Sequence, residues 1–236
     1  MAKRSTKPAP KKTASSHDGP HERTGITGVI ILAMVACFLG VNLGIIQLVF
    51  KPVETVNVMP KEDQIKPQTV YYLPGVDRGS ANWKGMETAF LSEDPINIAI
   101  SESDLNTWSR NTFRFTPPAA NERQGASTII PGSPNFRIHD DHLTLGITFR
   151  AGGRGNTTDI TAQVTGVFQM VGGRPVFIPD EVYLGSARLP PGYRGLIYYT
   201  LLGLFQQSEA FEPYETAWKS LNQATIADRQ VILERR

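Results

Sequence analysis

The feature that most constrains this chain is a stretch of 26 residues, Gly25 to Phe50, that contains no charged side chain. As an α-helix it would be about 39 Å long, at about 1.5 Å per residue. About 20 apolar residues suffice to cross the hydrocarbon core of a bilayer. A core helix of a soluble domain would carry a polar face, and this stretch has none. The sequence therefore predicts a single transmembrane helix over residues 25–50.

The segment before this helix sets its expected orientation. Residues 1–24 carry six basic and two acidic side chains, and Lys51 is the lone basic residue just after the span. Flanking Lys and Arg residues favour the cytoplasmic side, so we expect a cytoplasmic N-terminus and an extracytoplasmic C-terminal domain. The segment is rich in Lys, Ser, Thr and Pro without an apolar period, which predicts a disordered tail.

Charge and cysteine content narrow the class of protein. The chain has 24 basic and 22 acidic residues, of which 18 basic and 20 acidic residues lie outside the tail. The rest of the chain therefore has no excess of basic residues, and we expect no nucleic-acid partner. Cys37 is the only cysteine, which excludes an internal disulfide. The sequence Met34 to Cys37 resembles a poor lipoprotein box, and lipidation of Cys37 stays open as the alternative to a membrane span.

Three small residues, Ala36, Gly40 and Gly44, recur every fourth position within the span. This spacing places them on one helix face, where another helix can approach closely. They are the candidate contact for a homodimer or for an envelope protein partner. Asn42 and Gln47 are candidates for hydrogen bonds across such a contact.

Residues 51–80 contain four prolines and little apolar periodicity, which predicts a proline-rich tether. The domain is expected over residues 81–236. Its first elements are a short amphipathic helix over 82–92, with Asn82 as cap, and a strand over 96–100. Ser101 and Asp104 then fit a capping box at the start of the next helix. A nucleophilic role for Ser101 or Ser103 is the alternative, but neither lies in a Gly-x-Ser-x-Gly motif.

The clearest strands follow a long Pro- and Gly-rich loop over 114–135. Apolar and polar residues alternate over 142–150 and again over 160–170, which is typical of a half-buried antiparallel sheet. A third strand region over 175–190 is interrupted by Pro179. Helices over 192–206 and 212–222 and a final strand over 224–234 complete the pattern. We therefore expect an α+β fold, in which a curved antiparallel sheet packs against several helices.

Two motifs resemble reactive sites, and we assign neither. The sequence His139-Asp-Asp-His142 holds possible metal ligands, but Asp-Asp is also favoured in a tight turn. Gly152-Gly-Arg-Gly155 joins two strands and lacks the Gly-Lys-Ser/Thr ending of a phosphate-binding loop. We expect no metal, no cofactor and no catalytic residue, and a protein that is not an enzyme.

The helix over 192–206 is apolar over more than half of its circumference, so we expect it to be buried or to lie against an apolar partner. The first interpretation is an ordinary core. The second is a groove between this helix and the sheet that admits an acyl chain, since ligand sites are commonly apolar. The candidate groove residues are Leu145, Ile147, Phe149, Val164, Phe168, Tyr198, Leu201 and Phe205.

Two short sequences suggest a known class. These are Ile-x-Ile-Ser-Glu-x-Asp-Leu-Asn, from Ile98 to Asn106, and Gly185-Ser-Ala-Arg-Leu-Pro190 before a helix. With the single span, they make the chain resemble small membrane-anchored extracytoplasmic bacterial proteins of uncharacterised function. The chain is also similar to periplasmic lipoproteins suspected of binding lipids. The resemblance covers about residues 82–236 and implies the bacterial inner (cytoplasmic) membrane as location, but no catalytic residues.

The sequence thus predicts a membrane-anchored extracytoplasmic binding or scaffold protein, for a lipid or another envelope component. Two alternatives remain open. One is an envelope hydrolase whose site is not recognisable from the sequence. The other is a protein whose transmembrane helix is the active part, docking a partner of an envelope complex.

Overall fold

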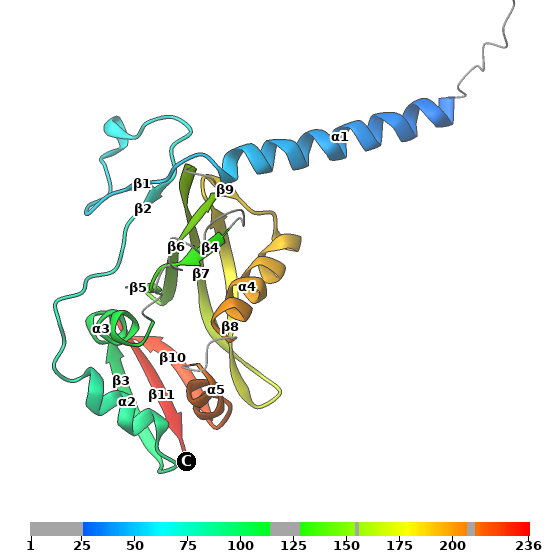
Figure 1. Ribbon diagram of the computed structural model, residues 1–236. Helices are drawn as coiled ribbons and strands as arrows, with labels where there is room; N and C mark the ends of the chain where they lie inside the picture. Colours follow the sequence, from blue (N-terminus) through cyan, green and yellow to red (C-terminus); the bar gives the residue numbers. More distant parts are fainter. Residues whose placement is uncertain (1–25, 114–127, 154–155, 207–210) are drawn as a thin grey trace, which may run out of the picture. The chain divides into compact units, whose positions relative to one another are not determined.

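The computed structural model describes residues 26–113, 128–153, 156–206 and 211–236 (Figure 1). Contacts divide the chain into two compact units, Met1–Asn42 and Leu43–Arg236. The described part of the first unit belongs to helix α1 (Ile26–Val49), whose last residues fall in the second unit. Among the described residues, α1 is the one helix long and apolar enough to cross a membrane. The expected apolar helix is therefore present.

The second unit is an α+β domain, as predicted. Its helices and strands alternate irregularly along the chain, and antiparallel pairing dominates its sheets. In chain order the elements are β1 (Glu54–Thr55), the 3-10 helix η1 (Glu62–Gln64), β2 (Tyr71–Tyr72), α2 (Trp83–Leu91), β3 (Ile96–Ser101), α3 (Glu102–Thr112), β4 (Thr128–Pro131), β5 (Asn135–His139), β6 (His142–Gly153), β7 (Asn156–Val171), β8 (Arg174–Leu184), β9 (Ala187–Arg188), α4 (Pro191–Gln206), α5 (Glu212–Lys219), β10 (Gln223–Ala227) and β11 (Gln230–Arg235).

The larger sheet has six strands in the order β4-β6-β7-β8-β9, with β5 also paired to β6. Its long strands are those with the alternating apolar pattern, because one face is buried and the other is solvated. Gly172 and Gly173 make the tight β7–β8 turn with φ of 60° and 78°. The β5–β6 hairpin closes at His139 and His142, with Asp140 at a φ of 53°, so the predicted turn is confirmed.

The smaller sheet has three strands in the order β10-β11-β3, all antiparallel. The chain end therefore pairs with β3, more than 120 residues earlier in the sequence. Helix α4 packs on β8 of the larger sheet, and α2 contacts both α3 and α5 (Figure 1). The apolar core is built from both sheets and includes Ile147, Val164, Val182, Leu221 and Leu233.

Several local expectations differ from the structure. Asn82 precedes α2 but makes no side-chain cap, because its backbone is helical rather than extended. Strand β8 continues through Pro179, and a register shift at Thr165 and Gly166 of β7 accommodates the irregularity. Residues 128–131, expected within a loop, form β4 against the edge of β6. The remainder of that expected loop, 114–127, lies outside the described residues. The final strand is a hairpin, β10–β11, with positive φ at Asp228 and Arg229.

Residues 72–80, which we call the strap, fall in the segment predicted as a tether. They are hydrogen-bonded to the domain. The Asn135 Oδ1 atom accepts from the Gly75 N–H at 2.6 Å and from the Tyr72 hydroxyl at 3.0 Å. Along α3, the Val76 N–H donates to Glu102 and the Arg78 N–H donates to the Ser103 hydroxyl.

Candidate apolar binding site

The cluster Ser101 to Asp104, with its hydroxyls and carboxylates, forms the joint between β3 and α3. The capping box is confirmed: the Asp104 N–H donates to the Ser101 hydroxyl, and the Ser101 N–H donates to the Asp104 carboxylate at 3.0 Å. Asp104 also accepts from the Ser80 hydroxyl of the strap. Glu102 and Ser103 accept backbone N–H groups of the strap. These polar groups are thus engaged in holding chain segments together.

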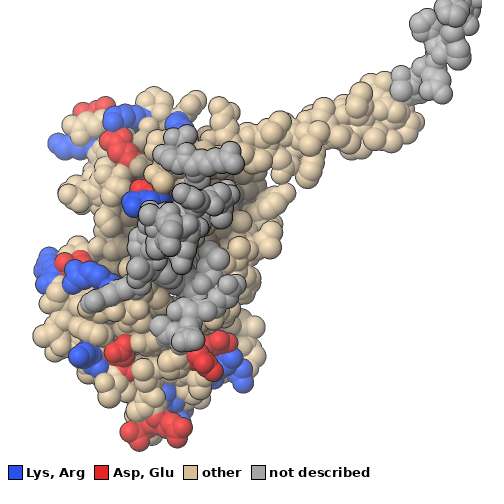
Figure 2. Space-filling model, viewed as in Figure 1, with Lys and Arg blue, Asp and Glu red and all other residues tan. Residues whose placement is uncertain are grey.

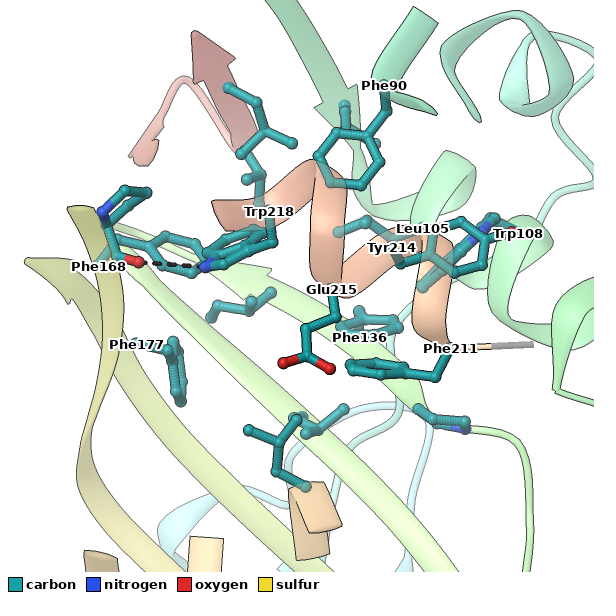
Figure 3. A pocket seen from close by; sticks show the side chains of 18 of the residues that line it. Phe90, Leu105, Trp108, Phe136, Phe168, Phe177, Phe211, Tyr214, Glu215 and Trp218 are labelled. Atoms are coloured by element: carbon teal, nitrogen blue, oxygen red, sulfur yellow. Dashed lines mark hydrogen bonds between the residues drawn. The ribbon is translucent and has the colours of Figure 1, made fainter. Parts of the chain in front are cut away.

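A cavity of about 480 Å³, partly open at the surface, lies between the helices and sheets of the domain and is within the size range of ligand pockets. Its wall is contributed by α2, α3, α4 and α5 on the helical side and by strands of both sheets. Figure 3 shows aromatic rings from these elements pointing into one space. The cavity is therefore assembled from segments that span the whole domain.

Aromatic side chains make much of this wall, and they contact one another in edge-on and tilted pairs. The ring centroids of Trp108 and Tyr214 are 5.2 Å apart, and those of Phe168 and Trp218 are 5.5 Å apart. Such pairs add stability beyond the burial of their area. The Trp218 indole N–H donates to the Pro175 carbonyl at 3.1 Å, so the polar atom of this ring is satisfied by the protein. The wall is thereby held in shape and leaves an apolar surface facing the cavity.

Several of these large side chains, including Leu105, Trp108, Phe136 and Phe168, are only partly buried, although they pack against the core. Protein interiors are normally close-packed, with few voids larger than a water molecule. An apolar space of this size leaves its lining without contact partners on one side. A bound apolar molecule would supply the van der Waals contacts that the lining side chains lack.

Polar groups are few on the lining. Glu215 points into the cavity between Phe177 and Phe211 (Figure 3), and its carboxylate pairs with Lys219 at 2.6 Å one helical turn later. Glu87 accepts a hydrogen bond from the Tyr214 hydroxyl. Arg174 also borders the cavity, at the exposed start of β8. Small numbers of polar groups on an apolar wall fix the orientation of a ligand in known pockets.

The structure places the predicted groove residues in three groups. Leu145, Ile147, Phe168, Tyr198 and Leu201 line the cavity. Phe149 and Val164 belong to the buried core and do not line it. The side chain of Phe205 lies outside the described part of α4. The rings that the prediction missed include those on α2, α3, α5, β5 and β8. The inward positions of Trp108, Tyr214 and Trp218 on their helices were the available signal for three of them.

The predicted helix-contact residues lie on α1. Ala36, Gly40 and Gly44 are exposed, and a Cβ added at either glycine would meet no described atom within 4 Å. Asn42 donates its amide to the Phe38 carbonyl of the same helix at 2.7 Å. His139 and His142, the metal-like pair, contact the carboxylates of Asp140 and Asp141 at 2.9 Å and 2.6 Å.

The burial of Tyr198 at the cavity predicts how the stability of the folded protein depends on pH. Desolvation, with a smaller contribution from Tyr199, raises the pKa of Tyr198 to about 12. An unfolded tyrosine titrates near 10, so between about pH 10 and 12 the unfolded chain loses this proton while the folded chain keeps it. Stability therefore falls as pH rises through this window. We expect Tyr198→Phe to lose less stability from about pH 9 to 12 than the wild type, measured by denaturant unfolding; equal losses would contradict the assignment.

No protein-family model, no curated protein and no solved structure matches this chain. The resemblance to membrane-anchored and lipid-binding envelope proteins thus stays a prediction.

Proposed function

We propose that this protein is a membrane-anchored binding protein that holds an elongated apolar molecule, such as an acyl chain, in the cavity of its domain. The observation that carries the proposal is the cavity of about 480 Å³ with its wall of aromatic and aliphatic side chains. Each methylene group transferred from water into such a space contributes about 0.8 kcal/mol. Ten or so methylenes would therefore supply a substantial binding free energy even after the costs of association.

In this proposal α1 is the anchor, in the bacterial cytoplasmic membrane. Its length and its lack of charge support a span. The basic residues of the 1–24 segment support a cytoplasmic N-terminus, with the domain in the periplasm. An apolar ligand in an aqueous compartment has to be shielded from water by a binding protein, because exposed hydrocarbon is unfavourable in water. A protein anchored beside the bilayer is well placed to take up or hand over such a molecule.

The test is a substitution that fills the cavity, followed by a measurement of whether the ligand still binds. Leu145→Trp extends an indole from β6 into the empty space, so we expect it to displace the ligand without the overpacking cost of about 1–3 kcal/mol of a filled core. Ile129→Trp is the matched control, because Ile129 is 67% exposed on β4 and does not line the cavity. Both full-length variants would be purified from a bacterial envelope in mild detergent and examined by native mass spectrometry with lipid extraction.

The expected result is an apolar adduct on the wild type and on Ile129→Trp that is lost from Leu145→Trp at an unchanged melting temperature. Lipid bound around α1 contributes equally to the adducts of both variants, because they share the same membrane span, so it does not affect the difference between them. Equal adducts on the two variants would contradict the proposal. A folded wild type free of adduct would also contradict it and would direct attention to protein partners.

A further inference from the structure

Helix α4 presents an uncharged apolar face to its surroundings. Tyr193, Leu196 and Tyr199 are 41%, 64% and 58% exposed. Arg194 is the only charged residue in the helix, and its guanidinium donates to the backbone carbonyls of Asp180 and Leu189. A surface helix of a soluble domain carries charged or polar residues on its outer side. The described exposed residues of α4 include no charged side chain, and the polar ones among them are Thr200 and Gln206, with the Thr200 hydroxyl donating to the Leu196 carbonyl at 2.8 Å.

Much of the surface charge of the domain lies away from α4. In the view of Figure 2, blue and red side chains gather around η1, along α3, at the turn between α2 and β3 and near α5. The described atoms on the flank where α4 lies are tan. The exposed apolar residues of α4 thus carry no charge themselves, and the Arg188–Glu181 ion pair at 2.7 Å is a charged group shortly before the helix begins.

The chain that leads into α4 is bonded to the end of the apolar helix α1. The Ser186 N–H donates to the Leu48 carbonyl at 2.9 Å, and the Ser186 hydroxyl donates to the Lys51 carbonyl at 3.2 Å. Gly185 approaches so closely, with a φ of +57°, that a Cβ there would lie 2.0 Å from the Val49 carbonyl oxygen. All of these residues belong to the unit Leu43–Arg236. Pro191, where α4 begins, follows Ser186 by five residues, at most about 18 Å of extended chain.

We propose that the outward face of α4, formed by Tyr193, Leu196 and Tyr199, lies in the interfacial layer of the bilayer that α1 spans. The inference rests on the proposed anchor. The end of a spanning helix is at the membrane–water interface, and the bonds to Ser186 hold the start of α4 near that level. Tyrosine is enriched in this layer because its ring is apolar and its hydroxyl remains hydrated. An apolar helix face gains by burial there.

This placement gives α4 a second role in the proposed function. Tyr198, Leu201 and Leu202 on its other side line the cavity, and Tyr199, at the edge of the outward face, also borders it. The helix then separates the cavity from the acyl region of the bilayer, and the ligand source is the membrane itself. A molecule would pass between bilayer and cavity beside α4 without crossing water.

The experiment measures the depth of single nitroxide labels on the full chain reconstituted in phosphatidylcholine nanodiscs. Native Cys37, exposed on α1, reports the anchor. In a Cys37→Ala background, Leu196→Cys and Tyr199→Cys report α4. Ile129→Cys is the control at an equally exposed apolar position on β4. Collisions with a water-soluble nickel chelate and with oxygen are recorded by electron paramagnetic resonance.

We expect broadening by the nickel chelate to be lost at positions 37, 196 and 199 and retained at 129, with oxygen broadening retained at 196 and 199. If the nickel chelate broadens the signals at positions 196 and 199 as much as at 129, but not the signal at 37, the placement of α4 is wrong. The assignment of α1 as the membrane anchor would still hold. Loss of both nickel and oxygen broadening at 196 and 199 means that protein covers the face, such as a second copy, and also overturns the placement of α4. Nickel broadening at position 37 overturns the anchor together with the inference.

Discussion

Replacing Arg235 by alanine is expected to destabilise the domain by about 3 kcal/mol, because four carbonyls, three of them on partly buried residues, lose a charged donor at about 1–3 kcal/mol for each one that water does not reach. Arg235 ends β11 and is only 7% exposed. Its guanidinium donates to the carbonyls of Asp94 at 3.0 Å and Phe90 at 3.2 Å, and also to those of Ala89 and Ser92. These carbonyls belong to the last turn of α2 and the turn after it, where a positive charge also complements the helix dipole.

The same side chain donates to the Ser220 hydroxyl at 3.1 Å, so it joins α2, the end of α5 and the smaller sheet at one point. Arg236→Ala is a matched control, because it removes the same side chain from the next, exposed position, and we expect a change within about 0.5 kcal/mol. Arg235→Lys should fall between the two, since an ammonium group keeps the charge but not the planar fork of donors.

The measurement is denaturant unfolding of the full chain in detergent, followed by tryptophan fluorescence. Trp108 and Trp218 report from the cavity wall and Trp83 from α2. Equal stability of Arg235→Ala and Arg236→Ala would show that the carbonyls find other donors and that the guanidinium is not the link between these elements.

Features with a local cause were predictable from the sequence. The apolar helix can be predicted from the composition of its own segment alone, and α1 runs from Ile26 to Val49 within the predicted range 25–50. The alternation over β6 and β7 reflects the pleat of each strand. The capping box at Ser101 and Asp104 depends on residues three apart. Each of these signals is contained within one element, so no knowledge of the tertiary structure was required.

The cavity could be predicted only in part, because it depends on how distant elements converge. The sheet and α4 residues of its wall were found from periodicity, since each has an apolar face. Trp108, Phe136 and Tyr214 also had inward positions, but their meeting in one space follows from the pairing of β11 with β3 and the packing of α2 on α5. Whether an apolar face meets another face or borders a space is a matter of packing geometry, which residue spacing does not encode.

The strap was missed for a related reason. A proline-rich segment with little apolar periodicity carries no signal of burial, and 72–80 is held by side-chain to backbone hydrogen bonds. The Asn106 amide donates to the Phe136 carbonyl at 2.7 Å and to the Val76 carbonyl at 3.3 Å, and in each case the partners are 30 positions apart in the sequence. Asparagine is common in turns and loops, so its type alone does not identify such a bridge.

The second large effect is expected at Gly75 of the strap. An alanine Cβ there would lie 1.7 Å from the Phe136 carbonyl oxygen and 2.9 Å from the Asn106 Nδ2 atom. Because both neighbours belong to the bridge between α3 and β5, the strap has to move away and lose its bonds to Asn135. We expect Gly75→Ala to cost about 3 kcal/mol, from overpacking and from the lost hydrogen bonds.

Gly85→Ala is the matched control, since glycine in the middle of α2 has no described atom within 4 Å of an added Cβ. There the same substitution should stabilise the protein by about 0.5–1 kcal/mol, because alanine has less backbone freedom to lose. Denaturant unfolding of the two full-length variants gives the free energies, and hydrogen exchange at the Val76 and Arg78 amides reports the strap directly.

The pattern of the two readouts shows how far the strap is part of the folded core. If exchange at Val76 and Arg78 accelerates and global stability also falls, the bonds of Asn106 and Asn135 couple the strap to α3 and β5 as one cooperative unit. Faster exchange at unchanged global stability would mean that the strap opens locally and that α3 and β5 do not need it. If Gly75→Ala matches Gly85→Ala in both readouts, the close approach to Phe136 is relieved at no cost, and the strap acts as a tether.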